Sequence, residues 1–376
     1  MKDNRNYERT GKRGHRKQRF GIIAGLALLA LLLAVKARLT APTEFTSEDL
    51  CSLLQQKAEI CDFTPQTDAD DWTYFYVADM RSVYRINARL AIPELVCGDC
   101  DGNVQVSGDT LYFLRKGNRS SNGKWIAADL DGTNQRVLSS RLQTYLEGWH
   151  RTVVGDYLLI EGEVGTKFVP LDGRRTEAQP LTIAEKKVEE LLWTDGTVLY
   201  FTTVQSETDP ERFGFVDLWR YDFAGEPQKV DVPDTYEYGS HTGGKVFFRD
   251  RTGKAVYALS LPEEKWTRLG YGGGTVYPTE DGEYLYCAGE RIERFDDSAL
   301  GNENVVLRTT KGVYLGLLNA VGDHWICTYM EYHPNWKTCG CKDADYMHYY
   351  IRTQVVSSET RTVLWHSDGD SYIMDY

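Results

Sequence analysis

Four cysteines occur at spacings that suit thiol chemistry. They are Cys97 and Cys100 in a CGDC motif, and Cys339 and Cys341 in a CGC motif. Three interpretations are open: disulfides, within the first motif or between the two; a zinc site made of all four thiolates; or free thiols in a reducing environment. C-x-C is an unusual spacing for zinc, and a thioredoxin-like role for CGDC would need βαβ surroundings, which the sequence around it does not predict.

The other cysteines carry a plainer expectation. Cys51 and Cys61 are predicted to lie on one helix, where ten residues rise about 15 Å and so prevent a disulfide. Cys287 and Cys327 fall inside predicted strands. Buried thiols packed in the core are the usual state there.

The long insertion at 329–348 is the main candidate for ligand binding. It gathers aromatic, histidine and acidic side chains, namely Tyr332, His333, Trp336, Asp343, Asp345 and His348. Such side chains on a long loop are typical of a recognition surface. The alternatives are a loop that only covers the channel of the fold, and a metal site made by the two histidines with an aspartate.

The chain carries no familiar catalytic motif. The patterns G-x-S-x-G, H-E-x-x-H, the P-loop and G-x-G-x-x-G are all missing. This favours a non-catalytic protein without a cofactor, zinc excepted, that binds a protein, peptide or glycan. The 55 Asp and Glu residues leave open a carboxylate pair for glycoside chemistry, so the alternative is a hydrolase or lyase acting on sugars or lactones. A third hypothesis is a signalling sensor.

A repeat defines the elements that position these residues. Seven two-residue turns, spaced by 38 to 48 residues, each precede a strand rich in aromatic and β-branched residues: DD at 70–71, GD at 108–109, GD at 155–156, DG at 195–196, GG at 243–244, DG at 281–282 and GD at 322–323. Such turns favour tight hairpins. With four short strands per unit, the pattern predicts an all-β propeller of seven blades, or six if one unit is degenerate.

The ends of the repeat predict how the ring closes. No strand pattern precedes Asp70, so blade one is expected to lack its innermost strand. The unused strand at 371–376 would supply it and cover the open sheet edges. Before the repeat, a helix is predicted from Thr46 to Cys61, with Thr46 or Ser47 as its N-cap.

One segment resembles known propellers. The sequence ADLDGTNQRVL at 128–138 is similar to the strand–DG[ST]N–strand hairpin of low-density-lipoprotein-receptor class-B (YWTD) propellers, of bacterial TolB-like propellers and of related bacterial propellers of unknown function. The resemblance covers residues 68–376 as a repeat. The YWTD tetrad and the DPxWSPDG element are missing, so the resemblance implies the fold and no functional residue. Those families mostly bind proteins or peptides.

The first forty residues predict the topology in the membrane. Residues 1–19 form a basic tail, and an uncharged apolar run, FGIIAGLALLALLLAV, follows within a transmembrane signal-anchor at 20–38. The positive-inside rule places the tail in the cytoplasm and the propeller outside it. A linker with the short helix spans 39–67, and the propeller spans 68–376. A cleaved signal peptide is the alternative.

The charge distribution excludes one class of partner. Residues 1–19 carry eight Lys or Arg against two acids, so the formal −12 of the whole chain leaves −18 for the remainder. Nucleic-acid binding needs clustered Lys and Arg on the folded body. We therefore expect no nucleic-acid partner, and a membrane contact only through residues 20–38.

Overall fold

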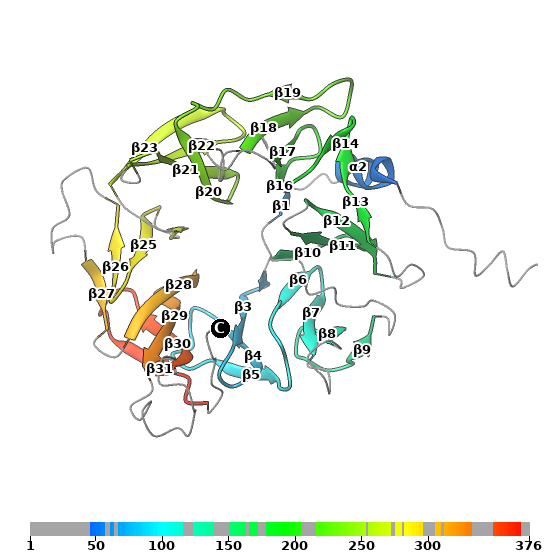
Figure 1. The fold of residues 1–376 in the computed structure, drawn as a ribbon. Helices are drawn as coiled ribbons and strands as arrows, with labels where there is room; N and C mark the ends of the chain where they lie inside the picture. Colours follow the sequence, from blue (N-terminus) through cyan, green and yellow to red (C-terminus); the bar gives the residue numbers. More distant parts are fainter. Residues whose placement is uncertain are drawn as a thin grey trace, which may run out of the picture. The chain divides into compact units, whose positions relative to one another are not determined.

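Seven antiparallel sheets, each built from four consecutive strands, follow one another along the chain as the blades of an all-β propeller (Figure 1). The computed structural model describes residues 46–56, 61–63, 67–115, 123–138, 150–162, 165–171, 178–204, 216–252, 255–271, 275–279, 282–295, 305–309, 312–332 and 349–369. All of them belong to the unit Thr46–Tyr376. The prediction of seven blades is confirmed.

The first three blades lie between residues 68 and 180. Blade one holds β2 (Asp68–Ala69), β3 (Trp72–Val77), β4 (Ser82–Ile86) and β5 (Glu94–Cys97). Blade two holds β6 (Gln105–Ser107), β7 (Thr110–Arg115), β8 (Lys124–Asp129) and β9 (Arg136–Val137). Blade three holds β10 (His150–Val154), β11 (Tyr157–Glu161), β12 (Lys167–Pro170) and β13 (Gln179–Pro180).

The last four blades lie between residues 190 and 366. Blade four holds β16 (Glu190–Thr194), β17 (Leu199–Val204), β18 (Val216–Tyr221) and β19 (Gln228–Lys229). Blade five holds β20 (Tyr236–Thr242), β21 (Lys245–Asp250), β22 (Ala255–Ser260) and β23 (Lys265–Tyr271). Blade six holds β24 (Val276–Pro278), β25 (Tyr284–Ala288), β26 (Arg291–Arg294) and β27 (Val305–Arg308). Blade seven holds β28 (Gly312–Val321), β29 (His324–Tyr332), β30 (Tyr349–Ser357) and β31 (Val363–His366).

All seven predicted turns join the first strand of a blade to its second. The backbone is left-handed at the turn residues that need it, with φ of 54° at Gly108 and 52° at Gly322. Asp70 adopts the same conformation, with φ of 52°, which aspartate tolerates better than most residues. The turn chemistry read from the sequence therefore sets the period of the fold.

Apolar side chains from successive blades pack together in most of the gaps between blades. In one such cluster, Phe75 and Val77 of blade one meet Val321, Ile326 and Val355 of blade seven. Blade seven thus packs directly against blade one. Because each of these residues is removed from water, the contact contributes to closing the ring through the hydrophobic effect.

The predicted N-terminal helix is shorter than expected. Helix α2 spans Ser47–Gln56, and the amide of Asp49 donates to Oγ1 of Thr46 at 3.3 Å, which confirms Thr46 as the N-cap. Leu50 and Leu54 are buried. The helix packs beside β14 (Thr182–Ile183), which forms a small hairpin with β15 (Lys186–Lys187).

The prediction that the helix extends to Cys61 is wrong. Cys61 lies instead in β1 (Cys61–Asp62), which pairs antiparallel with β16 and adds a fifth strand to the blade-four sheet. The neighbouring Phe63 is buried, and its carbonyl accepts a hydrogen bond from Thr152 Oγ1 at 2.9 Å. Pairing with an open sheet edge competes with helix formation in a short segment, because the edge offers hydrogen bonds to the backbone groups of that segment.

The prediction that blade one lacks its innermost strand is also wrong. β2 fills this position and pairs with Trp72 and Thr73 of β3. Its two residues carry no strand pattern of their own, so the sheet edge imposes the extended conformation. The predicted closing strand at 371–376 lies outside the described residues, as does the segment 20–38. Within the described part of the chain, no helix is long and apolar enough to cross a membrane.

The strand directions define two faces of the propeller. Turns between first and second strands and between third and fourth strands open on one face, here named the turn face. Connections between second and third strands open on the other, here named the loop face, together with the links between blades. The connections from β7 to β8, from β17 to β18 and from β29 to β30 join second to third strands, so they open on the loop face.

Candidate functional site

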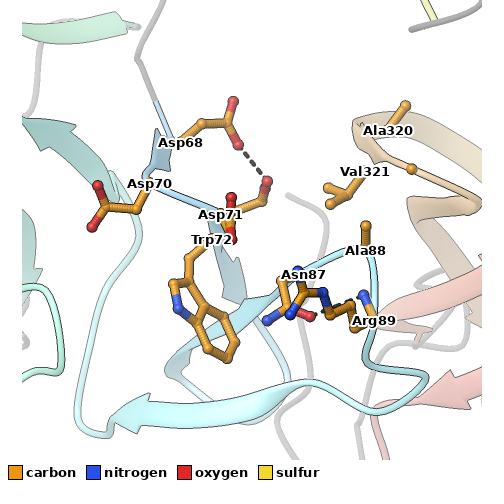
Figure 2. Close-up of a pocket in the computed structure, with 11 residues that line it drawn as sticks. Asp68, Asp70, Asp71, Trp72, Asn87, Ala88, Arg89, Ala320 and Val321 are labelled. Atoms are coloured by element: carbon orange, nitrogen blue, oxygen red, sulfur yellow. Dashed lines mark hydrogen bonds between the residues drawn. The ribbon is translucent and has the colours of Figure 1, made fainter.

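A pocket of about 430 Å³ opens on the turn face where blade one meets blade seven (Figure 2). The turn before β3 contributes Asp70 and Asp71, the end of β4 contributes Asn87 and Arg89, and the turn of blade seven contributes Gly322. We name this site the aspartate pocket. Its remaining lining residues are Asp68, Trp72, Thr73, Ala88, Ala320 and Val321.

Close packing between the two blades sets the depth of the aspartate pocket. A Cβ atom on Gly322 would lie 2.7 Å from Cβ of Ala88 and would also need a strained backbone. Only glycine therefore lets the two walls approach this closely without a shift.

Asp68 is held in place by both blades. Its carboxylate accepts a hydrogen bond from Oγ1 of Thr73, drawn in Figure 2, and another from Nδ2 of Asn319 in blade seven at 3.3 Å. Asp70 and Asp71 are exposed to solvent. The pocket therefore combines one fixed carboxylate with two that are open to a ligand, against the single guanidinium of Arg89.

Trp72 offers a ligand less aromatic surface than its position in the aspartate pocket suggests. The guanidinium of Arg85 lies 4.2 Å from the centre of its ring, and Arg85 is itself paired with Glu94 at 3.1 Å. One face of the indole is thus covered by a cation–π contact. A ligand can reach only the parts of the ring that this contact leaves uncovered.

A second group of charged residues crosses the same blade junction on the loop face. Nη1 of Arg352 donates to Oδ2 of Asp79 at 2.6 Å and to the carbonyl of Gly369 at 2.5 Å, and Nε donates to Glu331 at 3.0 Å. The amide of Gly369 also donates to Asp79, at 3.0 Å. We name these four residues the arginine cluster.

The arginine cluster joins the end of blade seven to blade one. The side chain of Asp79 is fully buried, and such a carboxylate is costly unless it is paired. Burial by itself lowers the pKa of Arg352, but hydrogen bonds to Asp79 and Glu331 outweigh it and raise the pKa. The guanidinium therefore stays charged and neutralises the buried carboxylate.

A third polar group involves blades three, four and five. In blade four, Glu190 accepts a hydrogen bond from the hydroxyl of Tyr238 and lies 3.2 Å from Nδ1 of His241. The Tyr238 hydroxyl also lies 3.0 Å from the same ring nitrogen. Together with Glu161 of blade three, we name these residues the glutamate cluster. The His241 side chain is only 8% exposed.

Glu161 is the most perturbed acid of this group. Burial of its carboxyl group, together with the negative charges of Glu190 and Glu189, raises its pKa well above the usual range, although the residue as a whole is only half-buried. The amide of Leu191 donates to the carboxylate and opposes the shift. A raised pKa favours the protonated form of a carboxyl group, and that form can act as a hydrogen-bond donor or a general acid.

The cysteine predictions are answered in part. Sγ of Cys97 lies 3.6 Å from Sγ of Cys100, so the two thiols are neighbours that are not bonded. Cys51, Cys287 and Cys327 are free as well, and no disulfide occurs among the described residues. The described side chains also contain no group of three or more metal ligands. Cys339 and Cys341 lie outside the described residues, so a four-thiolate zinc site stays a prediction.

The predicted loop site also remains a prediction. Tyr332 is the last residue of β29 and pairs with Tyr349, so it belongs to a strand rather than to the loop. His333, Trp336, Asp343, Asp345 and His348 lie outside the described residues. The insertion connects the second and third strands of blade seven.

The structure adds sites that reasoning from the sequence missed. The aspartate pocket had a visible signal, because 70–71 is the one turn of the seven in which both residues are acidic. Arg352 and Glu161 had none. Both lie in ordinary strand patterns, and only the packing of blades brings their partners close.

Comparisons with known proteins found similar solved structures and no relative in sequence. No family model matches the sequence, and no curated protein matches it. Similar solved structures include the β-propeller domain of the Trilobed protease from Pyrococcus furiosus, with 13% identity, TM-score 0.44, and coverage of 81% of this chain and 96% of that one. The putative TolB from Agrobacterium tumefaciens has 14% identity, TM-score 0.36, and coverage of 62% and 84%.

A third structure belongs to a larger protein. The acylaminoacyl peptidase of Pyrococcus horikoshii has 12% identity and TM-score 0.46 over 82% of this chain, which spans about half, 52%, of the peptidase. The neighbours are thus TolB-like and peptidase propellers, and the predicted YWTD class is not specifically supported. The seven sheets of the structure themselves identify the chain as a seven-bladed β-propeller.

Proposed function

We propose that this propeller is a non-catalytic binding module, and that its aspartate pocket takes a basic side chain of a protein or peptide ligand. The observation that carries the proposal is the pocket of about 430 Å³ lined by three aspartates and one arginine. Binding sites for small groups commonly have volumes of about 300–1,000 Å³. A lysine or arginine side chain fits such a volume with room for the neighbouring peptide.

The carboxylates supply the acceptors that a guanidinium or ammonium group needs. Asp68 is fixed by Thr73 and Asn319, so it loses little freedom when a ligand binds. Asp70 and Asp71 stand on a tight turn at the rim. Hydrogen bonds between carboxylates and charged donors are about twice as strong as neutral ones.

The charge of the body favours the same class of ligand. The residues after the basic tail carry a formal −18, which attracts basic partners over a distance and speeds their association. A glycan is favoured less, because sugars are usually held by stacking on an open aromatic face and Arg85 covers one face of Trp72. We therefore choose a basic protein or peptide over a glycan.

The proposal includes a place for the module. We infer that residues 20–38 anchor the chain in a membrane, with the basic tail in the cytoplasm and the propeller outside it, because the apolar run and its flanking charges follow the positive-inside rule. Extraction of membranes at high pH tests the anchor. An anchored chain stays in the pellet, whereas release of the chain would contradict this part of the proposal.

Binding of a fluorescent arginine- and lysine-rich peptide to the purified full-length protein tests the pocket. The double variant Asp70→Asn, Asp71→Asn should weaken binding about tenfold or more, since each charged hydrogen bond contributes about 1.5–3 kcal/mol. The control variant Asp109→Asn, Asp156→Asn removes the same charge from the equivalent turns of blades two and three. It should change the affinity less than about threefold.

Two results would contradict the pocket as the binding site. Equal losses in both double variants would show that only net charge matters. Unchanged binding in the pocket variant, with loss in Trp336→Ala, would place the ligand on the predicted loop site instead.

A second candidate function rests on the glutamate cluster. Burial and the charge of Glu190 raise the pKa of Glu161, so the pair offers the two carboxyl groups that a hydrolase or lyase for sugars or lactones requires, with Glu161 as the weaker acid. Turnover of chromogenic glycosides and lactones by the full-length protein tests this alternative. Activity that disappears in both Glu161→Gln and Glu190→Gln would support it over a pure binding module.

A further inference from the structure

The CGDC turn at the end of blade one holds two thiols side by side. Cys97 is the last residue of β5, and Cys100 follows after the exposed Gly98 and Asp99. Their sulfur atoms lie 3.6 Å apart. A disulfide bond has an S–S length of about 2.05 Å, so a shift of roughly 1.5 Å would bring the two sulfurs to bonding distance.

The backbone on both sides of the turn is fixed. Cys97 pairs with Val83 in the sheet, and the amide of Cys100 donates to the carbonyl of Arg81 at 2.9 Å. Cys100 also forms an isolated bridge with Arg115 of blade two. The left-handed backbone of Asp99, with φ of 58°, turns the chain so that both side chains point the same way. Proximity of the thiols is therefore built into the fold.

The two thiols are chemically unequal. The contact between the two thiols lowers the pKa of Cys97, burial opposes this effect, and the charge of Arg115 adds to the lowering. The same contact, followed by burial, raises the pKa of Cys100. Of the two, Cys97 is the more acidic thiol, and the thiolate is the nucleophilic form of cysteine.

Access follows the same order. Cys97 is 8% exposed, whereas Cys100 is fully buried. Gly98 has only ordinary contacts, with Oγ of Ser82 3.8 Å from an added Cβ, so the exposed side of the turn is not crowded there. An incoming reagent would meet Cys97 first.

We propose that Cys97 and Cys100 form a redox-active dithiol that exchanges with a partner disulfide. The Cys97 thiolate attacks one sulfur of the partner disulfide, forms a mixed disulfide and releases the first partner thiolate. Cys100 then loses its proton, and its sulfur attacks that of Cys97. The Cys97–Cys100 bond forms and the second partner thiolate leaves. Two electrons pass to the partner, and the two thiol protons end on its two thiols.

The remaining described cysteines serve as internal controls. Burial raises the pKa of Cys51 and of Cys287 to about 11, and Cys327 is fully buried with a raised pKa for the same reason. None of them has a second thiol in hydrogen-bond contact among the described residues. They should react slowly with the same reagent.

Oxidised glutathione, mixed with the reduced full-length protein, tests the proposal. We expect a loss of two hydrogens localised by peptide mapping to a link between Cys97 and Cys100, reversed by dithiothreitol. In Cys100→Ser the reaction should stop at the mixed disulfide, with glutathione on Cys97. That adduct should form at least tenfold faster than one on Cys51, and Cys97→Ser should not form it at position 100.

Three results would overturn the proposal. The first is a link from Cys97 or Cys100 to Cys339 or Cys341. The second is zinc bound at one equivalent through these thiols in the reduced protein. The third is a Cys97 that reacts no faster than Cys51. Timed alkylation of the wild-type protein gives the same comparison of rates and needs no variant, so a variant that fails to fold leaves the test intact.

Discussion

The arginine cluster and the glutamate cluster place buried carboxylates between blades in opposite ways. In the arginine cluster, one guanidinium stands between Asp79 and Glu331 and bonds to both. In the glutamate cluster, Glu161 faces the negative charges of Glu190 and Glu189, and its raised pKa is the consequence. The first arrangement balances negative charge with a cation, whereas the second favours the protonated form of a carboxyl group.

The difference predicts two kinds of dependence on conditions. The charge of Arg352 does not change at any pH where the protein folds, so the arginine cluster keeps its cation throughout this range. The glutamate cluster can lose its proton as the pH rises, so its contribution should vary. The junction that must close the ring therefore carries the permanent charge.

The largest effect should come from removing that charge. Arg352→Met leaves Asp79 buried without its cation, which costs about 3–5 kcal/mol for a buried pair. Denaturation by urea should show this loss in the free energy of unfolding. Arg136→Met removes a charge from the exposed strand β9 and should change stability by no more than about 0.5 kcal/mol. Equal effects would show that the arginine cluster does not fasten the ring.

A smaller loss should follow from changing the backbone partner of the same cluster. A Cβ atom on Gly369 would lie 2.3 Å from the carbonyl oxygen of Asp79, so Gly369→Ala must move the chain away from blade one. We expect a cost of about 1–3 kcal/mol. Gly98→Ala meets only Ser82 at 3.8 Å and should be nearly neutral. An unchanged free energy of unfolding in Gly369→Ala would mean that the segment 367–369 can move away from blade one without loss of stability.

These junctions also show what the sequence could predict. The seven turns and the strands after them depend on neighbouring residues, so their pattern is visible in the chain. Asp79 and Arg352 are 273 residues apart, and each lies in a segment with no unusual feature. Likewise, β1 forms because β16 offers an open edge. The local sequence preferences of Cys61 and Asp62 do not predict this strand.

The candidate sites also differ in whether the local sequence or the packing of blades determines them. The paired acids at 70–71 are a local feature, and they mark the aspartate pocket. The neighbours of Glu161 come from the start of blade four, so its raised pKa depends on how blades three and four pack. The thiols at 97 and 100 are close in sequence, so a contact between them could be expected from the chain alone. The opposite shifts of their pKa depend on the contact and the burial that the fold gives them.

The pH dependence of stability should come from Glu161. Its pKa is raised in the folded state above the usual 4.5, so the folded protein holds the proton more tightly than the unfolded chain. The stabilisation is complete below the unfolded pKa and is lost as the pH rises through the folded pKa. Each tenfold difference in proton affinity between the two states contributes about 1.4 kcal/mol. Glu161→Gln should remove this slope and should be more stable than the wild type at high pH, as urea titrations at a series of pH values would measure.

The smallest effect should separate the partners within the glutamate cluster. A double-mutant cycle of Glu190→Gln and Tyr238→Phe should give a coupling of about 0.5–1.5 kcal/mol, the usual net contribution of one hydrogen bond. Glu190→Gln should also move the pH dependence from Glu161 to lower pH, because it removes a negative charge that raises the pKa. If the pH dependence stays in place, Glu190 does not raise the pKa of Glu161, and burial together with Glu189 sets it. The contrast between the two clusters would then depend on desolvation more than on the facing carboxylate of Glu190.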